Sequence, residues 1–134
     1  MRYKFLEHTA DVKFQAFGKT IEEAFENAAS ALMETIAGKI KIKEKSSKKI
    51  EVKGKDNESL LRDFLEEFLY FLDAEDFLVS KVKIKIKENK IVGEVMGDKA
   101  SEYKFTNNVK AITYNEMFVK KIKGKWTCQV VLDV

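Results

Sequence analysis

Two carboxylates and the single histidine of the chain are the residues best suited by type to do chemistry. His8 lies three residues before Asp11 in the segment His-Thr-Ala-Asp-Val. A histidine and a carboxylate at this spacing can bind a metal ion, move a proton or hydrogen-bond within a turn. Asp133 is the penultimate residue, so its side chain and the terminal carboxylate of Val134 are two neighbouring anionic groups.

These groups suit a hard cation better than zinc. Calcium binds carboxylate, carbonyl and water oxygens, whereas zinc takes several nitrogen or sulfur ligands. One histidine and one cysteine cannot build an ordinary zinc site within the chain. Asp11 and Asp133 therefore form a candidate pair for a hard cation, and the alternative is that Asp133 is a solvated chain end.

Lys110 differs from the other lysines because it begins a predicted strand directly after a polar segment, residues 97–108, that has no periodicity. A loop of that length is often functional. Lys110 alternates with Ile112 and Tyr114, so it is either part of a functional rim or a solvated lysine at a strand end. Cys128 lies on an apolar strand face without an activating neighbour, which predicts a buried and unreactive thiol.

Several enzyme classes lack their sequence signature here. The chain has no G-x-S-x-G, no P-loop, no glycine-rich dinucleotide fingerprint and no H-E-x-x-H. Its 25 basic and 22 acidic residues nearly balance, which argues against a strongly basic nucleic-acid binder. One cysteine, no apolar N-terminal region and no apolar run near the roughly 18 residues of a membrane span predict a cytoplasmic protein.

Two helices are expected to position these residues. With 134 residues, of which 45% are hydrophobic, the chain fits one domain spanning residues 1–134. Thr20 and Glu23 form a capping box before apolar residues at helical spacing, which predicts a helix over residues 20–37. A second and more apolar run at this spacing predicts a helix that ends near Asp73.

Alternation of apolar and charged residues predicts the strands. They cover residues 3–6, 12–17, 39–43, 49–53, 81–87, 91–96, 109–121 and 125–134. Residues 39–53 and 81–96 each have the pattern of a hairpin. Two isolated helices among these strands predict the α+β class, with a mixed or mostly antiparallel sheet and both helices packed on one of its faces.

Four segments, taken in order, resemble the archease family. They are residues 8–12, 18–25, 110–114 and 131–134. Their motifs are H-T-A-D, a G-x-T-x-E-E-A-F helix start, K-A-x-T-Y, and a closing hydrophobic-Asp-hydrophobic tail. The resemblance spans essentially the whole chain, and the joint order of the motifs is more specific than any one of them.

The resemblance implies a function in RNA processing. Archeases are accessory proteins of the GTP-dependent tRNA-splicing ligase, which joins tRNA halves. They promote guanylylation of the ligase's active-site histidine and hence multiple turnover, and they broaden its use of nucleotides. The protein would then be a cofactor of an RNA ligase and no enzyme itself, with RNA reached only indirectly through the ligase and no membrane partner.

The resemblance also implies a divalent-cation site, assigned to calcium. The implied positions match the family's motifs: Asp11, Asp133 and Val134 for the metal, with Lys110 and His8 as further functional residues. Asn115 stands after Tyr114, where many members of the family have histidine. An asparagine oxygen can still coordinate calcium, so the role of Asn115 stays open.

Two other functions stay open from the residues alone. One is a small metal-dependent hydrolase in which Asp11 and Asp133 hold the metal and His8 is the general base. The other is a small RNA-binding module that uses the lysines of residues 81–87, although no aromatic residues alternate with those lysines. A solvated strand face that discourages edge-to-edge pairing accounts for the same lysines.

Overall fold

Seven strands and two α-helices make up most of the part described by the computed structural model, residues 1–7 and 11–134. In chain order the elements are β1 (Tyr3–Leu6), β2 (Val12–Gly18), α1 (Ile21–Ala37), β3 (Ser46–Lys53), α2 (Asn57–Glu75), β4 (Phe77–Lys87), β5 (Lys90–Lys99), the short 3-10 helix η1 (Ala100–Glu102), β6 (Ala111–Ile122) and β7 (Lys125–Asp133). The predicted α+β class is confirmed. Neither α1 nor α2 is both long and apolar enough to cross a membrane.

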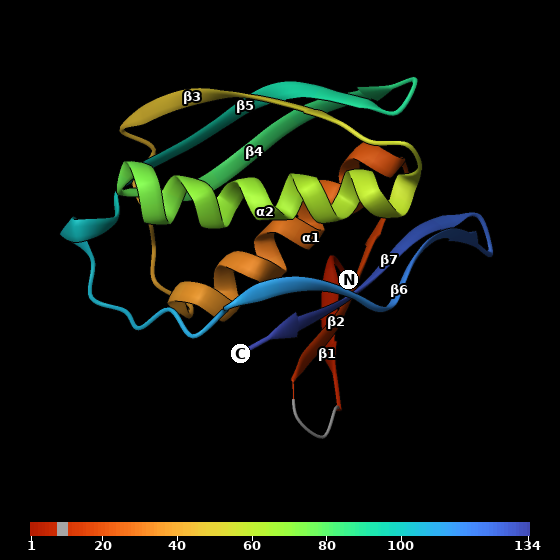
Figure 1. The fold of residues 1–134 in the computed structure, drawn as a ribbon, viewed down its shortest axis with the longest axis horizontal. Helices are drawn as coiled ribbons and strands as arrows, with labels where there is room; N and C mark the ends of the chain where they lie inside the picture. The colour runs from red at the N-terminus through yellow and green to blue at the C-terminus, as the bar shows by residue number, and fades with distance from the viewer. Residues whose placement is uncertain (8–10) are drawn as a thin grey trace.

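The strands form two antiparallel sheets, and both helices lie between them (Figure 1). One sheet, with the order β1-β2-β7-β6, joins the two ends of the chain and is called the terminal sheet below. The other, with the order β3-β5-β4, is called the central sheet. Helix α1 packs between β2 and β4, and α2 packs between β6 and the strands of the central sheet. The helices therefore cover one face of each sheet.

The core face of the terminal sheet follows from strand alternation. Phe14 and Ala16 of β2 are fully buried and lie opposite Val130 and Cys128 of β7. All four belong to the hydrophobic core that the helices share. The predicted buried position of Cys128 is confirmed, and burial raises the pKa of its thiol, so the group stays protonated and unreactive.

Helix α1 begins as its capping residues predict. The Thr20 hydroxyl accepts the N–H of Glu23 at 3.1 Å, and the Glu23 carboxylate accepts the N–H of Lys19 at 3.1 Å. Gly38 follows the last turn with a φ of 73°, a left-handed conformation that glycine adopts without steric cost. The predicted helix over residues 20–37 is confirmed.

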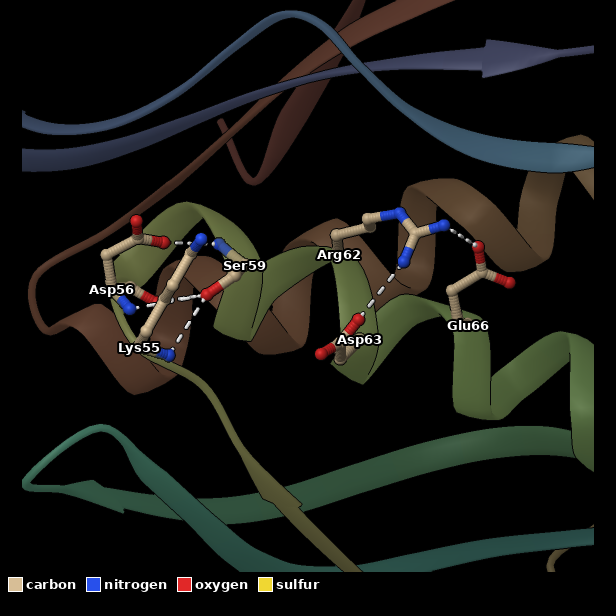
Figure 2. A network of polar contacts seen from close by, with 6 residues as sticks. All are labelled: Lys55, Asp56, Ser59, Arg62, Asp63 and Glu66. Carbon is tan, nitrogen blue, oxygen red and sulfur yellow. Dashed lines mark hydrogen bonds and ion pairs between the residues drawn. The ribbon is translucent and has the colours of Figure 1, made fainter.

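Helix α2 is fixed at its start by a reciprocal pair of hydrogen bonds (Figure 2). The Asp56 carboxylate accepts the N–H of Ser59 at 2.8 Å, and the Ser59 hydroxyl accepts the N–H of Asp56 at 3.2 Å. One turn further on, Arg62 pairs with Asp63 at 3.2 Å and with Glu66 at 3.3 Å. These contacts satisfy the free N–H groups of the first turn and orient the Arg62 guanidinium.

Phenylalanine rings connect the two helices with the central sheet. Successive ring centroids from Phe25 through Phe64, Phe68 and Phe71 to Phe77 are 5.9, 5.1, 6.5 and 6.0 Å apart. Tilted and edge-to-face pairs at such distances each add about 0.5–1.5 kcal/mol beyond the burial of their area. These ring contacts therefore join both helices to the central sheet.

Glutamates on the helices also hydrogen-bond the outermost strands. Glu26 of α1 accepts the N–H of Ile84 in β4 at 3.0 Å, and Glu58 of α2 accepts the N–H of Val119 in β6 at 3.1 Å. β4 and β6 are edge strands of their sheets, and an edge strand leaves unpaired N–H groups that invite unwanted pairing. The two glutamates therefore close one edge of each sheet.

The predicted hairpin over residues 39–53 is wrong. Residues 39–45 form no strand, and β3 pairs with β5 instead. Ile42 packs against the core, and the N–H of Lys43 donates to the Tyr103 hydroxyl at 2.9 Å. Of the two isoleucines that alternate with lysine here, Ile42 rests on the core without a partner strand and Ile40 is exposed.

The predicted loop over residues 97–108 is shorter in the structure. β5 continues to Lys99 and η1 follows it, so only residues 103–110 lack helix and strand. The predicted hairpin over residues 81–96 is confirmed as β4 and β5. Helix α2 runs on to Glu75, slightly past its predicted end.

Candidate functional site

Three segments meet at one end of the terminal sheet, and they carry most of the predicted site residues. Val12 of β2 pairs with Leu132 of β7, and Ala111 of β6 pairs with Asp133. The main-chain N–H of Lys110 donates to the carbonyl oxygen of Asp133 at 2.7 Å. Asp133 therefore lies between the start of β2 and the start of β6.

Asp11 immediately precedes β2. Because Val12 and Leu132 pair antiparallel, continuing the register by one position puts Asp11 opposite Asp133. Asp11 is half-buried and Asp133 is exposed. Two carboxylates at facing positions on neighbouring strands repel each other unless a positive charge offsets them. The fold thus brings the segments that carry these two carboxylates to the same end of the terminal sheet.

A hollow opens beside Asp133. It is lined by Asn107, Asn108, Val109, Lys110 and Val134. The Asn107 side chain accepts the N–H of Val109 at 2.9 Å, which holds the approach to β6 in place. Lys110 and Val134 are both exposed, and Val134 directly follows Asp133, so the hollow lies where β7 ends.

β6 is irregular near this site. Its register with β7 shifts between Thr113 and Phe118, and Glu116 has a φ of 55°. Lys13 of β2 pairs with the Glu116 carboxylate at 3.0 Å, and the Gln129 amide donates to the Glu116 carbonyl at 2.8 Å. A bulge re-aims the side chains of its strand, and here contacts from the neighbouring strand β7 and from β2 beyond it fix the bulge.

One contact of this region, between Arg62 of α2 and Tyr114 of β6, was not indicated by sequence spacing. The Arg62 guanidinium lies 5.1 Å from the ring centroid of Tyr114, which is 53% exposed. Asn115 is exposed, and its N–H donates to the Thr113 hydroxyl at 3.2 Å. The stacked pair joins α2 to β6, so no local pattern in the sequence could have revealed it.

His8 lies outside the described residues, so its predicted role stays a prediction. Within residues 1–7 and 11–134, no three side chains of His, Cys, Asp and Glu gather in a way that could hold a metal ion. The predicted calcium site consists instead of two carboxylate side chains and main-chain oxygen of Val134. The pairing of β7 with β2 and β6, and the main-chain hydrogen bond from Lys110 to Asp133, place the segments that carry these groups at one end of the terminal sheet.

Known proteins match this chain over almost its full length. The Archease protein family (MTH1598/TM1083) matches residues 3–134. A protein archease of Pyrococcus furiosus is 41% identical, with 99% of each chain covered. A protein archease of Methanosarcina barkeri is 39% identical, with 99% of this chain and 96% of that protein covered.

Solved structures share the fold. The solution structure of protein 1598 of Methanobacterium thermoautotrophicum superposes with a TM-score of 0.86 at 34% identity, over 99% of both chains. A crystal structure from Thermotoga maritima, described as an archease and possible chaperone, gives 0.69 at 21% identity over 98% of this chain and 96% of that one, which is a likeness of fold alone. Since the family match and relatives well above 30% identity both cover nearly every residue, this chain belongs to the archease family.

Proposed function

We propose that this protein is an accessory activator of a GTP-dependent tRNA-splicing ligase and not an enzyme in its own right. In this role it promotes guanylylation of the ligase's active-site histidine, supports multiple turnover in tRNA ligation and broadens the nucleotides that the ligase uses. Family membership supports the proposal. The observation that carries it is the meeting of the segments that bear Asp11, Lys110 and Asp133 at one end of the terminal sheet.

In the proposed site, Asp11, Asp133 and main-chain oxygen of Val134 hold a divalent cation, which we assign to calcium. The donors fit that ion, because calcium prefers carboxylate and main-chain oxygens and fills its remaining positions with water. Asp133 and Val134 are exposed, which leaves room for that water. When bound, the ion would add positive charge beside these carboxylates.

Lys110 adds a second positive group beside Asp133. Its main-chain bond to Asp133 fixes the start of β6 against the end of β7, so the lysine side chain projects from a defined point. This end of the terminal sheet carries both signs of charge, which suits a nucleotide-binding cleft that contains metal ions. Transfer of a phosphoryl-type group depends mostly on positioning and charge neutralisation, and charged groups at this end of the sheet can contribute to both.

A guanylylation assay tests the proposed function. The partner ligase is incubated with radiolabelled GTP, and the label that stays on the denatured ligase is measured with and without this protein. We expect faster labelling with the wild-type protein, and a loss of about tenfold or more in that stimulation for Asp11→Asn and Asp133→Asn, as for other disrupted metal sites. Asp73→Asn on the exposed side of α2 is the matched control and should stimulate normally.

Calorimetric titration with calcium tests the metal site separately. Asp11→Asn and Asp133→Asn should bind calcium more weakly than the wild type, and Asp73→Asn should not. Unchanged calcium affinity in both site variants would remove the metal assignment. A ligase labelled equally fast with and without this protein would remove the activator function, and GTP hydrolysis by this protein alone would favour the hydrolase instead.

A further inference from the structure

The face of the terminal sheet that points away from the helices carries aromatic rings and lysines side by side. Residues paired across antiparallel strands share a face, so the pairings place Phe118 with Gln129 in one row, and Phe17, Thr127 and Lys120 in the next. The helices pack against the opposite face. This surface is called the outer face of the terminal sheet below.

Lysine ammonium groups lie over both of these rings. Lys4 and Lys125 place their nitrogens 5.9 and 5.5 Å from the centroid of the Phe17 ring. Lys120 places its nitrogen 4.9 Å from the centroid of Phe118. The three lysines are exposed and the two rings are half-buried. Positive charge and aromatic surface therefore occur together over all four strands.

Polar side chains between the rings hold this surface in a fixed shape. Gln15 donates to the Gln129 side chain at 2.9 Å, and Gln129 donates to the Glu116 carbonyl at 2.8 Å. Gln129 and Thr127 are buried, although they lie on the side of the sheet without helices. The Glu116 carboxylate pairs with Lys13 at 3.0 Å, so its negative charge is offset locally.

The outer face of the central sheet carries lysines without rings. Lys83 lies opposite Glu94, and Lys85 lies opposite Val92. Apart from Phe77, which is buried in the core, β3, β4 and β5 contain no aromatic residue. Charge alone attracts phosphate, but only an aromatic ring also stacks on a base. The two outer faces therefore differ in the ligand that they suit.

We propose that the outer face of the terminal sheet binds single-stranded RNA. Bases stack on Phe17 and Phe118 in place of the lysine ammonium groups that lie over these rings, and Lys4, Lys120 and Lys125 turn to the phosphates. Each nucleotide offers one π-face and one negative charge, which matches rings flanked by lysines; an acidic protein surface would match only the lysines. A four-stranded sheet that has helices on its other face is a known layout for stacking bases on aromatic side chains.

This binding goes beyond the proposed function and departs from the expectation that RNA is reached only through the ligase. Gln129, Val131 and Asp133 are every second residue along β7, so their side chains share one side of the strand. This is also the side of the proposed RNA surface. The proposed RNA surface and Asp133 therefore share one face of the terminal sheet. The test uses this protein alone, so its failure would leave the ligase function untouched.

Fluorescence anisotropy with a labelled oligouridine of about 12 nucleotides measures the binding. Titrations at about 50 and 200 mM salt separate stacking from charge, because phosphate contacts weaken with salt. Phe17→Leu and Phe118→Leu should each weaken binding about fivefold or more, since leucine keeps an apolar side chain but offers no ring. Lys120→Gln and Lys125→Gln should each lower the dependence of log affinity on log salt by about 0.7.

Lys83→Gln with Lys85→Gln on the central sheet is the matched control, and it should keep the affinity within about twofold of the wild type. Thermal melting checks that each variant is folded. If a ring variant is unfolded, the double variant Lys4→Gln with Lys125→Gln replaces it, because both lysines are exposed. This double variant should bind the oligonucleotide more weakly and with a smaller dependence on salt. The proposal is overturned if the wild type does not bind the oligonucleotide, or if folded ring variants bind it like the wild type. It is also overturned if only the control variants weaken binding, or if heparin competes as well as single-stranded RNA.

Discussion

The two sheets are built from different parts of the chain, and only one of them carries the candidate chemistry. The central sheet comes from residues 46–99, and two of its three strands are joined by a tight turn. The terminal sheet joins residues 3–18 to residues 111–133 and has an irregular strand, β6. Asp11, Lys110 and Asp133 all lie at one end of the terminal sheet. The central sheet serves as a scaffold, and the terminal sheet, which joins segments far apart in the chain, carries the candidate site.

The helices make the two sheets depend on each other. Phe64 of α2 is fully buried, and its ring lies 5.9 Å from Phe25 of α1 and 5.1 Å from Phe68. Glu26 and Glu58 add hydrogen bonds from the helices to one edge strand of each sheet. A difference in role between the sheets therefore does not imply that they fold separately.

The largest effect is expected for Phe64→Ala, which should lower the free energy of unfolding by about 3–5 kcal/mol, because it leaves a cavity between the sheets. Urea unfolding followed by circular dichroism and by the fluorescence of Trp126 in β7 measures this. Tyr70→Ala, at a position on the same helix that is 55% exposed, should change it by less than about 0.5 kcal/mol.

The two signals of the Phe64→Ala experiment also test whether the chain is one domain. Circular dichroism reports on the whole molecule, whereas Trp126 reports on the terminal sheet. Coincident transitions are expected for one cooperative unit. Separate midpoints would show that the terminal sheet unfolds by itself, and the comparison between the sheets would then extend to their stability.

The second prediction contrasts a lysine from each sheet. Lys110→Ala should reduce the stimulation of ligase guanylylation severalfold, because it removes the positive group proposed to act beside Asp133. It should change the free energy of unfolding by less than about 0.5 kcal/mol, since the side chain is exposed. Lys83→Ala, at an exposed position of the central sheet, should leave both unchanged. Thermal melting and the guanylylation assay measure the two quantities, and a collapse in the stability of Lys110→Ala would make Lys110 structural.

How much the sequence could predict depends on how local the signal is. The helix over residues 20–37 and the hairpin over residues 81–96 follow from caps, spacing and turns that involve near neighbours, and the structure confirms both. Strand pairing is not local. Alternation showed that residues 39–43 have one apolar side, but it could not show that this side rests on the core without a partner strand.

The candidate site shows the same limit. The sequence singled out Asp11, Lys110 and Asp133 by residue type and by resemblance, but their proximity depends on β7 pairing with both β2 and β6. Phe17 and Phe118 went unnoticed because they come from distant segments and share a face only through that pairing. The division of the strands into two sheets could not be predicted either. Alternation shows which side of a strand is apolar, but it does not show which strand lies next to it.

The smallest effect is expected at the edge of the central sheet. Burial is the main cause that raises the pKa of the Glu26 carboxyl above its ordinary value of 4.5, and the hydrogen bond from the Ile84 N–H opposes the shift. An acid with a higher pKa in the folded state binds more protons when folded. Stability from this group is therefore present at low pH and falls as the pH rises from 4.5 through the raised pKa.

Glu26→Gln should remove that pH dependence, because glutamine keeps an oxygen that can accept the Ile84 N–H but carries no charge. At neutral pH the variant should be as stable as the wild type or more stable by less than about 1 kcal/mol, since the carboxyl is partly exposed and water screens its charge. Urea unfolding of both proteins across the range above pH 4.5 measures the difference. A variant that becomes less stable than the wild type as the pH rises would mean that the charge of Glu26 strengthens its bond to β4 by more than its burial costs, and helix α1 would then hold the edge of the central sheet through an ionised carboxylate.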